Sequence, residues 1–363
     1  MKVLLLGKPY FKAALEALGH EVKCLDGANQ GDVRVTGFPV GVKQILALLP
    51  KGWEPEFVLL GEESMHPMFL GLEFLDVPVG WLAMDSHIHL AWHRAYAAAF
   101  DFIWVVQRDY VDAYRWDGRR QTVQWSPVWA DPTVDRDLGL PREHDLVFVG
   151  TLNPAWNPER VKLIQAVQAR LPIHLVSGDY AEPFNRAKLV LNQCVANDIN
   201  FRTMQAMGCG ALLLMERIGN GLEELFEDRK HLVLYEKGNV DEVVALTRYY
   251  AAHEAERRAI AAAGREAVLA AHTTTHRVQA MLDLLASSDL HGIVTARKRE
   301  METIERLMAL VYEQAAHDYA AAAVRHPDGS PMRLGRLQFS SSYQYMADTI
   351  RKELGLEPSA VPA

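Results

Sequence analysis

The sequence contains few cysteines, no long apolar run and no excess of basic side chains. Only three of its 363 residues are cysteines (Cys24, Cys194 and Cys209), without the spacing of a zinc site or a disulfide framework. No apolar run reaches about 18 residues, the length that a membrane span requires, and the apolar start is too short for a signal peptide. The net charge of -8 argues against the basic surface that nucleic-acid binding requires. We therefore expect a cytoplasmic protein with no integral membrane segment and no nucleic-acid partner.

Apolar strand patterns alternate with helical patterns along most of the chain. Strands are predicted at 3–6, 21–25, 57–60, 79–82, 102–106 and 123–125, and again at 146–149, 173–176, 188–192, 211–215 and 231–235. Helical patterns occupy 11–18, 42–49 and 68–75, and the chain from residue 240 onward is mostly helical. This alternation predicts an α/β protein with doubly wound parallel sheets.

The length predicts two such domains, because 363 residues exceed what one ordinary core holds. The polar, proline-bearing stretch 126–145 is the predicted linker. We expect a Rossmann-like domain over 1–130, a second over 145–286 and a helical extension over 290–357, which could dock a partner. Open α/β sheets bind ligands at the carboxyl ends of their strands, so two domains facing a cleft would share one site.

A glycine-rich loop in the second predicted domain indicates a phosphate-bearing ligand. Gly219-Asn220-Gly221 follows the apolar strand at 211–215 and opens directly into the helical sequence LEELF. Glycines let the backbone approach a ligand closely, and the first N–H groups of a helix attract negative charge. A phosphorylated small molecule is therefore the first ligand to consider.

The order of motifs from 145 to about 285 resembles the C-terminal domain of the CgeB-like, or spore maturation protein-like, glycosyltransferases. The matching pieces are LVFVGT at 146–151 with Arg160 downstream, KLVLN at 188–192, D-x-x-x-R-x-x-Q-A-x-x-x-G at 198–210, LEELFE followed by HLVLY, and AGREAVLAAHTTTHR at 263–277. The N-terminal half is similar more loosely, through WLAMDSH at 81–87. The resemblance implies the two-Rossmann GT-B architecture, with the first domain on the acceptor side. It also implies sugar transfer from a nucleotide-sugar donor to an acceptor hydroxyl in glycan or protein glycosylation, without a separate cofactor.

Such an enzyme must stabilise the negative charge that grows on a departing nucleoside diphosphate. After the predicted strand at 79–82, Asp85-Ser86-His87 lacks the second carboxylate of the Asp-x-Asp motif with which some glycosyltransferases hold a metal ion. We therefore predict no metal, and phosphate contacts from arginine, lysine and peptide N–H groups instead, because a guanidinium binds phosphate oxygens in a bidentate manner. The candidates are Arg160, Arg186, Lys188, Arg202 and the loop Gly219–Gly221.

Gln205 occupies a position at which the resembling family commonly has a glutamate that binds both ribose hydroxyls of the donor. A glutamine amide accepts one hydrogen bond and donates one, so ribose binding is still feasible in an altered form. Glu223 and Glu224 could share the ribose role. Alternatively, they are acidic residues of a first helical turn that stabilise the helix alone.

Asp85 and His87 are the candidate catalytic residues. They follow the predicted strand at 79–82, and a carboxylate or imidazole there could remove the proton of an acceptor hydroxyl. The alternative for Asp85 is a helix N-cap. His89 and His93 have the i, i+4 spacing of a metal pair, but the simpler interpretation is a pair of partly buried helix histidines.

Two other functions fit the same pattern. A sugar-nucleotide epimerase of the same fold would convert the nucleotide sugar without an acceptor. A degenerate protein, as Gln205 and the helical tail would allow, would bind the nucleotide sugar without turning it over.

Overall fold

The computed structural model describes residues 1–61, 64–115 and 121–357, which form two compact units. The first unit comprises Met1–Val106, Tyr110–Trp125 and the chain from Leu282 onward. The second unit comprises Gln107–Asp109 and Ser126–Met281. The helices from residue 282 onward thus group with the N-terminal residues, whereas the sequence analysis treated 290–357 as an extension. The domain boundaries at 130, 145 and 286 stay predictions.

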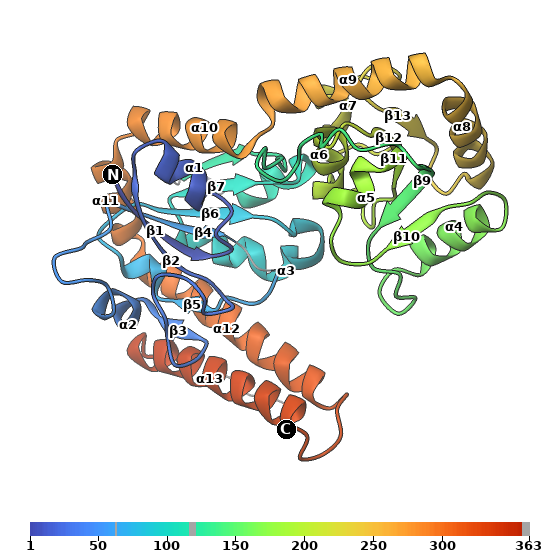
Figure 1. Cartoon of the computed structure of the whole chain (residues 1–363). Helices are drawn as coiled ribbons and strands as arrows, with labels where there is room; N and C mark the ends of the chain where they lie inside the picture. The colour runs from blue at the N-terminus through green and yellow to red at the C-terminus, as the bar shows by residue number, and fades with distance from the viewer. Residues whose placement is uncertain (62–63, 116–120, 358–363) are drawn as a thin grey trace. The chain divides into compact units, whose positions relative to one another are not determined.

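The first unit is built on a parallel six-stranded sheet, which Figure 1 shows in blue and cyan. Its strand order is β2-β1-β4-β6-β7-β8, and the strands are β1 (Lys2–Gly7), β2 (Glu21–Leu25), β4 (Phe57–Gly61), β6 (Val79–Ala83), β7 (Phe102–Val105) and β8 (Thr122–Trp125). Its helices are α1 (Lys12–Ala17), α2 (Val42–Ala47), α3 (Ser86–Tyr96), α11 (Leu290–Arg299), α12 (Met301–Ala323) and α13 (Pro331–Glu353), with short 3₁₀ turns at Leu72–Phe74 and Ala97–Ala99. The central strands are buried on both faces, as their continuous apolar sequences predict.

The predicted helix at 68–75 is wrong. The structure has a short strand, β5 (Phe69–Leu70), which pairs in parallel with β3 (Val40–Gly41), and then the 3₁₀ turn. Gly71 between them adopts a left-handed φ of 78°, which ends any helix at this point. The apolar residues that gave the helical pattern pack in the core of the first unit instead.

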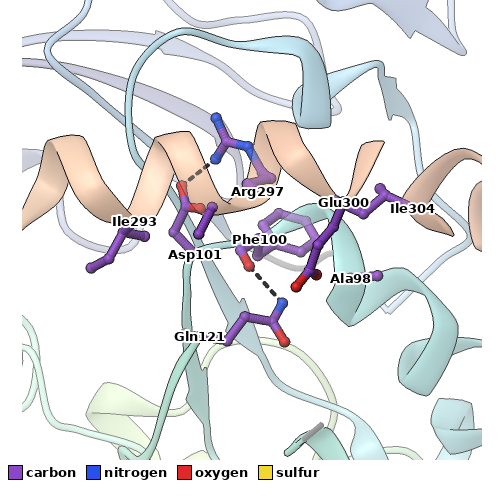
Figure 2. Close-up of a pocket in the computed structure, with 9 residues that line it drawn as sticks. Ala98, Phe100, Asp101, Gln121, Ile293, Arg297, Glu300 and Ile304 are labelled. Carbon is purple, nitrogen blue, oxygen red and sulfur yellow. Dashed lines mark hydrogen bonds and ion pairs between the residues drawn. The ribbon is translucent and has the colours of Figure 1, made fainter. Parts of the chain in front are cut away.

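A buried ion pair attaches α11 to the sheet of the first unit. Arg297 of α11 binds the carboxylate of Asp101, and Figure 2 shows the two side chains meeting in a small pocket beside Phe100 and Gln121. Arg297 also donates to the carbonyl oxygens of Leu75, at 2.5 Å, and Val77, at 3.1 Å. These contacts join segments that lie about two hundred residues apart in sequence, so the C-terminal helices complete the core of the first unit.

The second unit contains a parallel five-stranded sheet of order β10-β9-β11-β12-β13. Its strands are β9 (His144–Val149), β10 (His174–Val176), β11 (Ala187–Asn192), β12 (Leu212–Glu216) and β13 (Val233–Tyr235). Its helices are α4 (Pro158–Gln168), α5 (Ala181–Asn185), α6 (Phe201–Gly208), α7 (Leu222–Leu225), α8 (Val240–Ala252) and α9 (Glu254–Ala271), and α10 (Thr274–Ser287) leads the chain from the second unit back to the first. Both sheets are thus Rossmann-like and parallel.

The beginning of the predicted linker is packed rather than free. Val128, Trp129 and Ala130 are buried, and Ala130 forms a parallel bridge with Thr273. Arg277 donates hydrogen bonds to the carbonyl oxygens of residues 127 and 128. None of the helices formed by the described residues combines the length and the apolar character needed to cross a bilayer.

Candidate functional site

The candidate site of the second unit lies where β9, β11 and β12 end. These strands are neighbours and run in parallel, so their carboxyl ends meet at one edge of the sheet. The segments that follow them carry Gly150, Gln193 and the loop of Gly219. This edge is the usual ligand-binding edge of an open α/β sheet.

Arg202 of α6 is fixed at this edge by the strand ends. Its Nε and Nη2 donate to the carbonyl oxygen of Val149 at 3.0 and 2.7 Å, and its Nη1 donates to Oδ1 of Asn192 at 2.7 Å. The contact with Val149 is close because the next residue is Gly150: a Cβ at that position would lie 2.6 Å from Nη2. These three hydrogen bonds leave two of the five N–H donors of Arg202 for a ligand.

Arg160 of α4 lies near Arg202, and both contact Phe148. The guanidinium carbon of Arg202 is 4.8 Å from the centre of the Phe148 ring, and that of Arg160 is 5.7 Å from it. Arg160 donates through Nε to the Oε1 of Gln193 at 2.9 Å and through Nη2 to its carbonyl oxygen. The structure thus brings together two of the predicted phosphate-binding residues.

The charge of these two arginines is offset in part by the charges of Asp198 and Glu216. Neither guanidinium forms an ion pair with an acidic side chain among residues 1–61, 64–115 and 121–357. Burial and, to a smaller extent, the charge of Arg160 lower the pKa of Arg202 to about 10. Burying two unpaired like charges is costly, so an anion at this edge would be favoured.

Two acidic side chains lie in the same region but are occupied by peptide groups. Asp198 accepts hydrogen bonds from the N–H groups of Val195 and Ala196, which shapes the turn before α6. Glu216 ends β12 and accepts from the N–H groups of Cys194 and Gly238. Burial raises the pKa of Glu216, and these two N–H donors oppose the rise.

A hollow of about 380 Å³ lies at this edge between the strand ends and α4. Gln193, Glu216 and Lys237 line it from the sheet, while Glu159 and Lys162 line it from the helix. The volume falls within the range of small-ligand pockets. Because Gln193 also binds Arg160, the hollow adjoins the arginine pair.

Gln205 lies one turn beyond Arg202 on α6 and is partly buried. Its side chain hydrogen-bonds the hydroxyl of Tyr180, which donates to Asp135 at 2.8 Å. Burial and the neighbouring Asp135 raise the pKa of Tyr180, and the bond to Gln205 opposes the rise. The side-chain amide of Gln205, which is predicted to bind ribose, therefore hydrogen-bonds Tyr180 in this structure.

The loop Gly219–Gly221 has a structural role that the sequence analysis did not foresee. The Asn220 side chain is buried; it donates to Gln107 and to the carbonyl oxygen of Asn197, and it accepts from the N–H of Asp109. Gln107 also binds both backbone groups of Ile199. Asn220 thus clamps the segment 107–109 to the second unit, and only Gly219 of this loop is exposed.

The helix after this loop is short, and its acidic residues are paired. α7 has four residues, so its dipole is much smaller than that of a long helix. Glu223 pairs with Arg217 at 2.7 Å, and Glu224 pairs with Arg108 at 2.8 Å, both on the surface. These ion pairs are consistent with the alternative that Glu223 and Glu224 stabilise the protein without binding a ligand. Their role in ribose binding stays a prediction.

Lys188 and Arg186 do not join the arginine pair. Lys188 is the second residue of β11, which places it at the amino edge of the sheet, where it pairs with Asp145 at 2.7 Å. Arg186 precedes the same strand and pairs with Glu143 and Glu182. Because the carboxyl edge carries Arg202, these two residues lie at the wrong end of the strand to share a phosphate with it.

Asp85 and His87 lie at the carboxyl edge of the first unit's sheet. Asp85 follows β6 and occupies the N-cap position of α3, where its carbonyl oxygen accepts from the N–H groups of Ile88 and His89. His87 lies in the first turn, and its Nδ1 is buried without a hydrogen-bond partner in the described structure. Asp85 makes no side-chain capping hydrogen bond in the described chain, so the structure does not show the N-cap role, and the catalytic role of both residues stays a prediction.

His89 and His93 are packed among aromatic rings. His93 is fully buried, its Nδ1 lies 2.8 Å from the hydroxyl of Tyr114, and burial lowers its pKa well below the usual value. Nε2 of His89 lies 3.2 Å from Oγ of Ser64, and burial lowers its pKa as well. Within the described ranges, no group of three or more His, Cys, Asp or Glu side chains could hold a metal ion.

Several residues of the site were missed from the sequence. Asn192 accepts a hydrogen bond from Arg202, Gln193 accepts one from Arg160, and Gly150 leaves room for Arg202. Asn192 is the last residue of a predicted apolar strand, and the other two each directly follow one. Polar or glycine residues at that point of a parallel strand are a usable signal. Gln107 carries the same signal after β7.

Comparison with known proteins identifies the fold. Residues 134–283 match the model of a family described as glycosyl transferase-like. A search of curated proteins gave no match. The chain resembles HepE of Anabaena, which was solved in complex with UDP and glucose, and sucrose-phosphate synthase of Thermosynechococcus elongatus. In each comparison the TM-score is 0.54 and the sequence identity is 14%, and the match covers 79% of this chain and 100% of the other protein's chain. It also resembles a glycosyltransferase of Rickettsia africae, with a TM-score of 0.56, 9% identity and coverage of 79% and 99%. The chain therefore has the α/β fold of the GT-B glycosyltransferases, with two Rossmann-like domains, and its second unit matches a glycosyl transferase-like family.

Proposed function

We propose that this protein is a metal-independent glycosyltransferase of the hexosyltransferase type. It moves a sugar from a nucleotide-sugar donor to an acceptor hydroxyl in cytoplasmic glycan or protein glycosylation. The CgeB-like subfamily is part of this proposal. One observation carries it: Arg160 and Arg202 lie together at the carboxyl edge of a parallel sheet, with spare N–H donors and without an ion-pair partner among the described residues.

The arginine pair would stabilise the departing diphosphate. Negative charge grows on the phosphate oxygens as the bond between the anomeric carbon and the phosphate oxygen breaks, and fixed guanidinium groups stabilise that charge without a divalent ion. The N–H groups around Gly219 are additional candidate donors. A uridine nucleotide is the first donor to test, because HepE of Anabaena, which has a similar fold, was solved with UDP-glucose.

The acceptor would lie on the first unit, with Asp85 or His87 as the base. Removing the proton from the acceptor hydroxyl makes its oxygen a better nucleophile for the anomeric carbon. An inverting enzyme needs such a base, whereas a retaining enzyme can use the leaving phosphate.

A donor and acceptor screen tests this function. Nucleotide sugars are first ranked by thermal shift, because a ligand that binds only the folded state raises the melting temperature. The best donor is then incubated with candidate glycans and peptides in the presence of EDTA, and products are identified by mass spectrometry. We expect sugar transfer that is unaffected by EDTA. Loss of transfer on chelation, restored by a divalent ion, would show that the enzyme needs a metal.

The same screen separates the two competing functions. An epimerase would change the sugar of the donor without any acceptor. A degenerate binding protein would give a thermal shift with nucleotide sugars but no product in any mixture, and the engagement of Gln205 with Tyr180 favours testing this outcome. We expect Gln205→Glu, which restores the residue typical of the resembling family, to retain the thermal shift.

A further inference from the structure

A large hollow of the second unit lies at the amino edge of its sheet, opposite the arginine pair. It has a volume of about 1040 Å³ and is bounded by α9, by the segment before β9 and by the beginnings of β11 and β12. Lys188 and Gly210 mark those beginnings. The parallel strands separate the two edges, so this groove is distinct from the candidate donor site.

Basic side chains predominate in this groove. Five basic residues line it: Arg142, Lys188, Arg257, Arg258 and Arg265. Three acidic residues line it as well: Asp137, Glu254 and Glu266. The lining therefore has two more basic than acidic residues, and one positive charge in excess once the pairing of Lys188 with Asp145 is included, whereas the whole chain carries a charge of -8. A local excess of positive charge on an acidic protein favours a negatively charged ligand.

Arg257 is the most unusual of these side chains. Its side chain is buried, with 3% of its surface exposed. Its Nε has no hydrogen-bond partner within the described ranges, and its Nη2 lies 3.9 Å from the carboxylate of Glu254, with which Arg257 forms a long ion pair. Buried N–H groups normally have an acceptor, because an unpaired buried donor costs about 1–3 kcal/mol. Arg257 thus lacks the acceptor that a bound anion would supply.

Neighbouring guanidinium groups repel one another in the groove. Burial lowers the pKa of Arg257, and although Glu254 opposes the effect, the charges of Arg142 and Arg258 lower it further. Burial also lowers the pKa of Arg142. An anion among these groups would relieve both the burial cost and the repulsion.

We infer that this groove is a second binding site, for a soluble small molecule that carries two or more phosphate groups. Five basic side chains line the groove, and a ligand with several phosphate groups can contact more of them than one phosphate can. Guanidinium groups bind phosphate oxygens in bidentate pairs, and the volume suits a ligand of nucleotide size. The ligand would bind between α9 and the segment before β9.

Titration calorimetry with tripolyphosphate tests this site. Wild type is compared with Arg202→Ala, which alters the donor site, and with Arg258→Glu, which alters the groove. Arg258 suits the test because its side chain is 74% exposed and its ion pair with Glu254, at 3.5 Å, lies on the surface, so the charge reversal should leave the fold intact. Lys230→Glu is the matched control, since it reverses an exposed charge of the second unit outside the groove.

We expect a tripolyphosphate site that persists in Arg202→Ala and Lys230→Glu. In Arg258→Glu its affinity should fall by about tenfold or more, because a charge-assisted contact is replaced by repulsion. The inference is overturned if Arg202→Ala abolishes all tripolyphosphate binding, or if Arg258→Glu leaves it unchanged. It is also overturned if vesicles of phosphatidylglycerol bind through Arg258 while tripolyphosphate does not. The proposed donor site fails separately, if Arg202→Ala leaves nucleotide-sugar binding intact.

Discussion

The central chemical feature at the residue scale is the position of Arg202. Its guanidinium lies against Phe148 and hydrogen-bonds the ends of β9 and β11, so it is held in place before any ligand arrives. A fixed positive group loses little conformational entropy on binding, which makes it an effective phosphate contact. Gly150 is what allows this close approach.

Gly150→Ala should therefore weaken nucleotide binding. A Cβ at this position would lie 2.6 Å from Nη2 of Arg202 and 3.1 Å from the Phe148 ring, so the guanidinium must move. We expect the affinity for the preferred nucleotide, measured by calorimetry, to fall by about tenfold. Gly37→Ala is the control, because a Cβ there meets no atom within 4 Å. Equal affinities of the two variants would refute the positioning role of Gly150.

A buried carboxyl group in the first unit gives a prediction about pH. Burial raises the pKa of Glu73 to about 7, which is far above its ordinary value. The folded state then binds this proton more tightly than the unfolded state, so the contribution of Glu73 to stability decreases as pH rises from about 4.5 to 7.

Glu73→Gln should remove this dependence. At pH 8 the variant should be more stable than wild type by up to about 3 kcal/mol, because no charge is buried, and at pH 4 the two should nearly agree. Urea unfolding at both pH values measures the difference. A variant that is less stable than wild type at pH 8 would contradict the assignment of Glu73 as a buried, destabilising charge.

At the scale of secondary-structure elements, a buried ion pair joins α11 to the sheet of the first unit. Arg297 is 5% exposed and its partner Asp101 is 2% exposed, so neither charge is solvated. Burial raises the pKa of Asp101 to about 6, although Arg297 opposes this rise.

Arg297→Ala should destabilise the first unit by about 3–5 kcal/mol, because it leaves Asp101 charged and buried without a partner. Arg297→Ala combined with Asp101→Asn should recover part of the loss, because the uncompensated charge is then removed. Thermal unfolding followed by circular dichroism checks both variants. If the double variant is no more stable than the single one, the loss does not arise from the charge of Asp101.

The strands of the two large sheets were predictable from sequence because they are short apolar runs, most of them followed directly by a polar residue or glycine. The structure of the segment 68–75 was not predictable in the same way, because a short apolar run fits a strand or a helix equally well. In the candidate site, Arg160 and Arg202 were predicted from the motifs that carry them, and the structure brings them together, while their role in phosphate binding stays a prediction. Lys188 was misplaced although its position, near the start of a predicted parallel strand, already indicated the amino edge. The clamp of Gln107 and Asn220 joins residues 113 apart in sequence and left no local pattern.

At the scale of the whole molecule, the second unit carries two separate positive regions on opposite edges of one sheet. The pair Arg160 and Arg202 lies at the carboxyl edge, and the groove of Arg257 lies at the amino edge. The first unit contributes the candidate base and is completed by the C-terminal helices. Donor binding can therefore be tested on one unit by substitutions that leave the other unit unchanged.

Calorimetric titration of UDP in the presence of EDTA tests the central claim most directly. Wild type is compared with Arg202→Gln and Arg160→Gln, and Arg186→Gln serves as the matched control because it removes an exposed arginine away from the pair. We predict metal-free binding to wild type and to the control, and a loss of affinity of about tenfold or more in each of the other two variants. Binding that requires a divalent ion, or that is equally strong in all four proteins, would contradict the account.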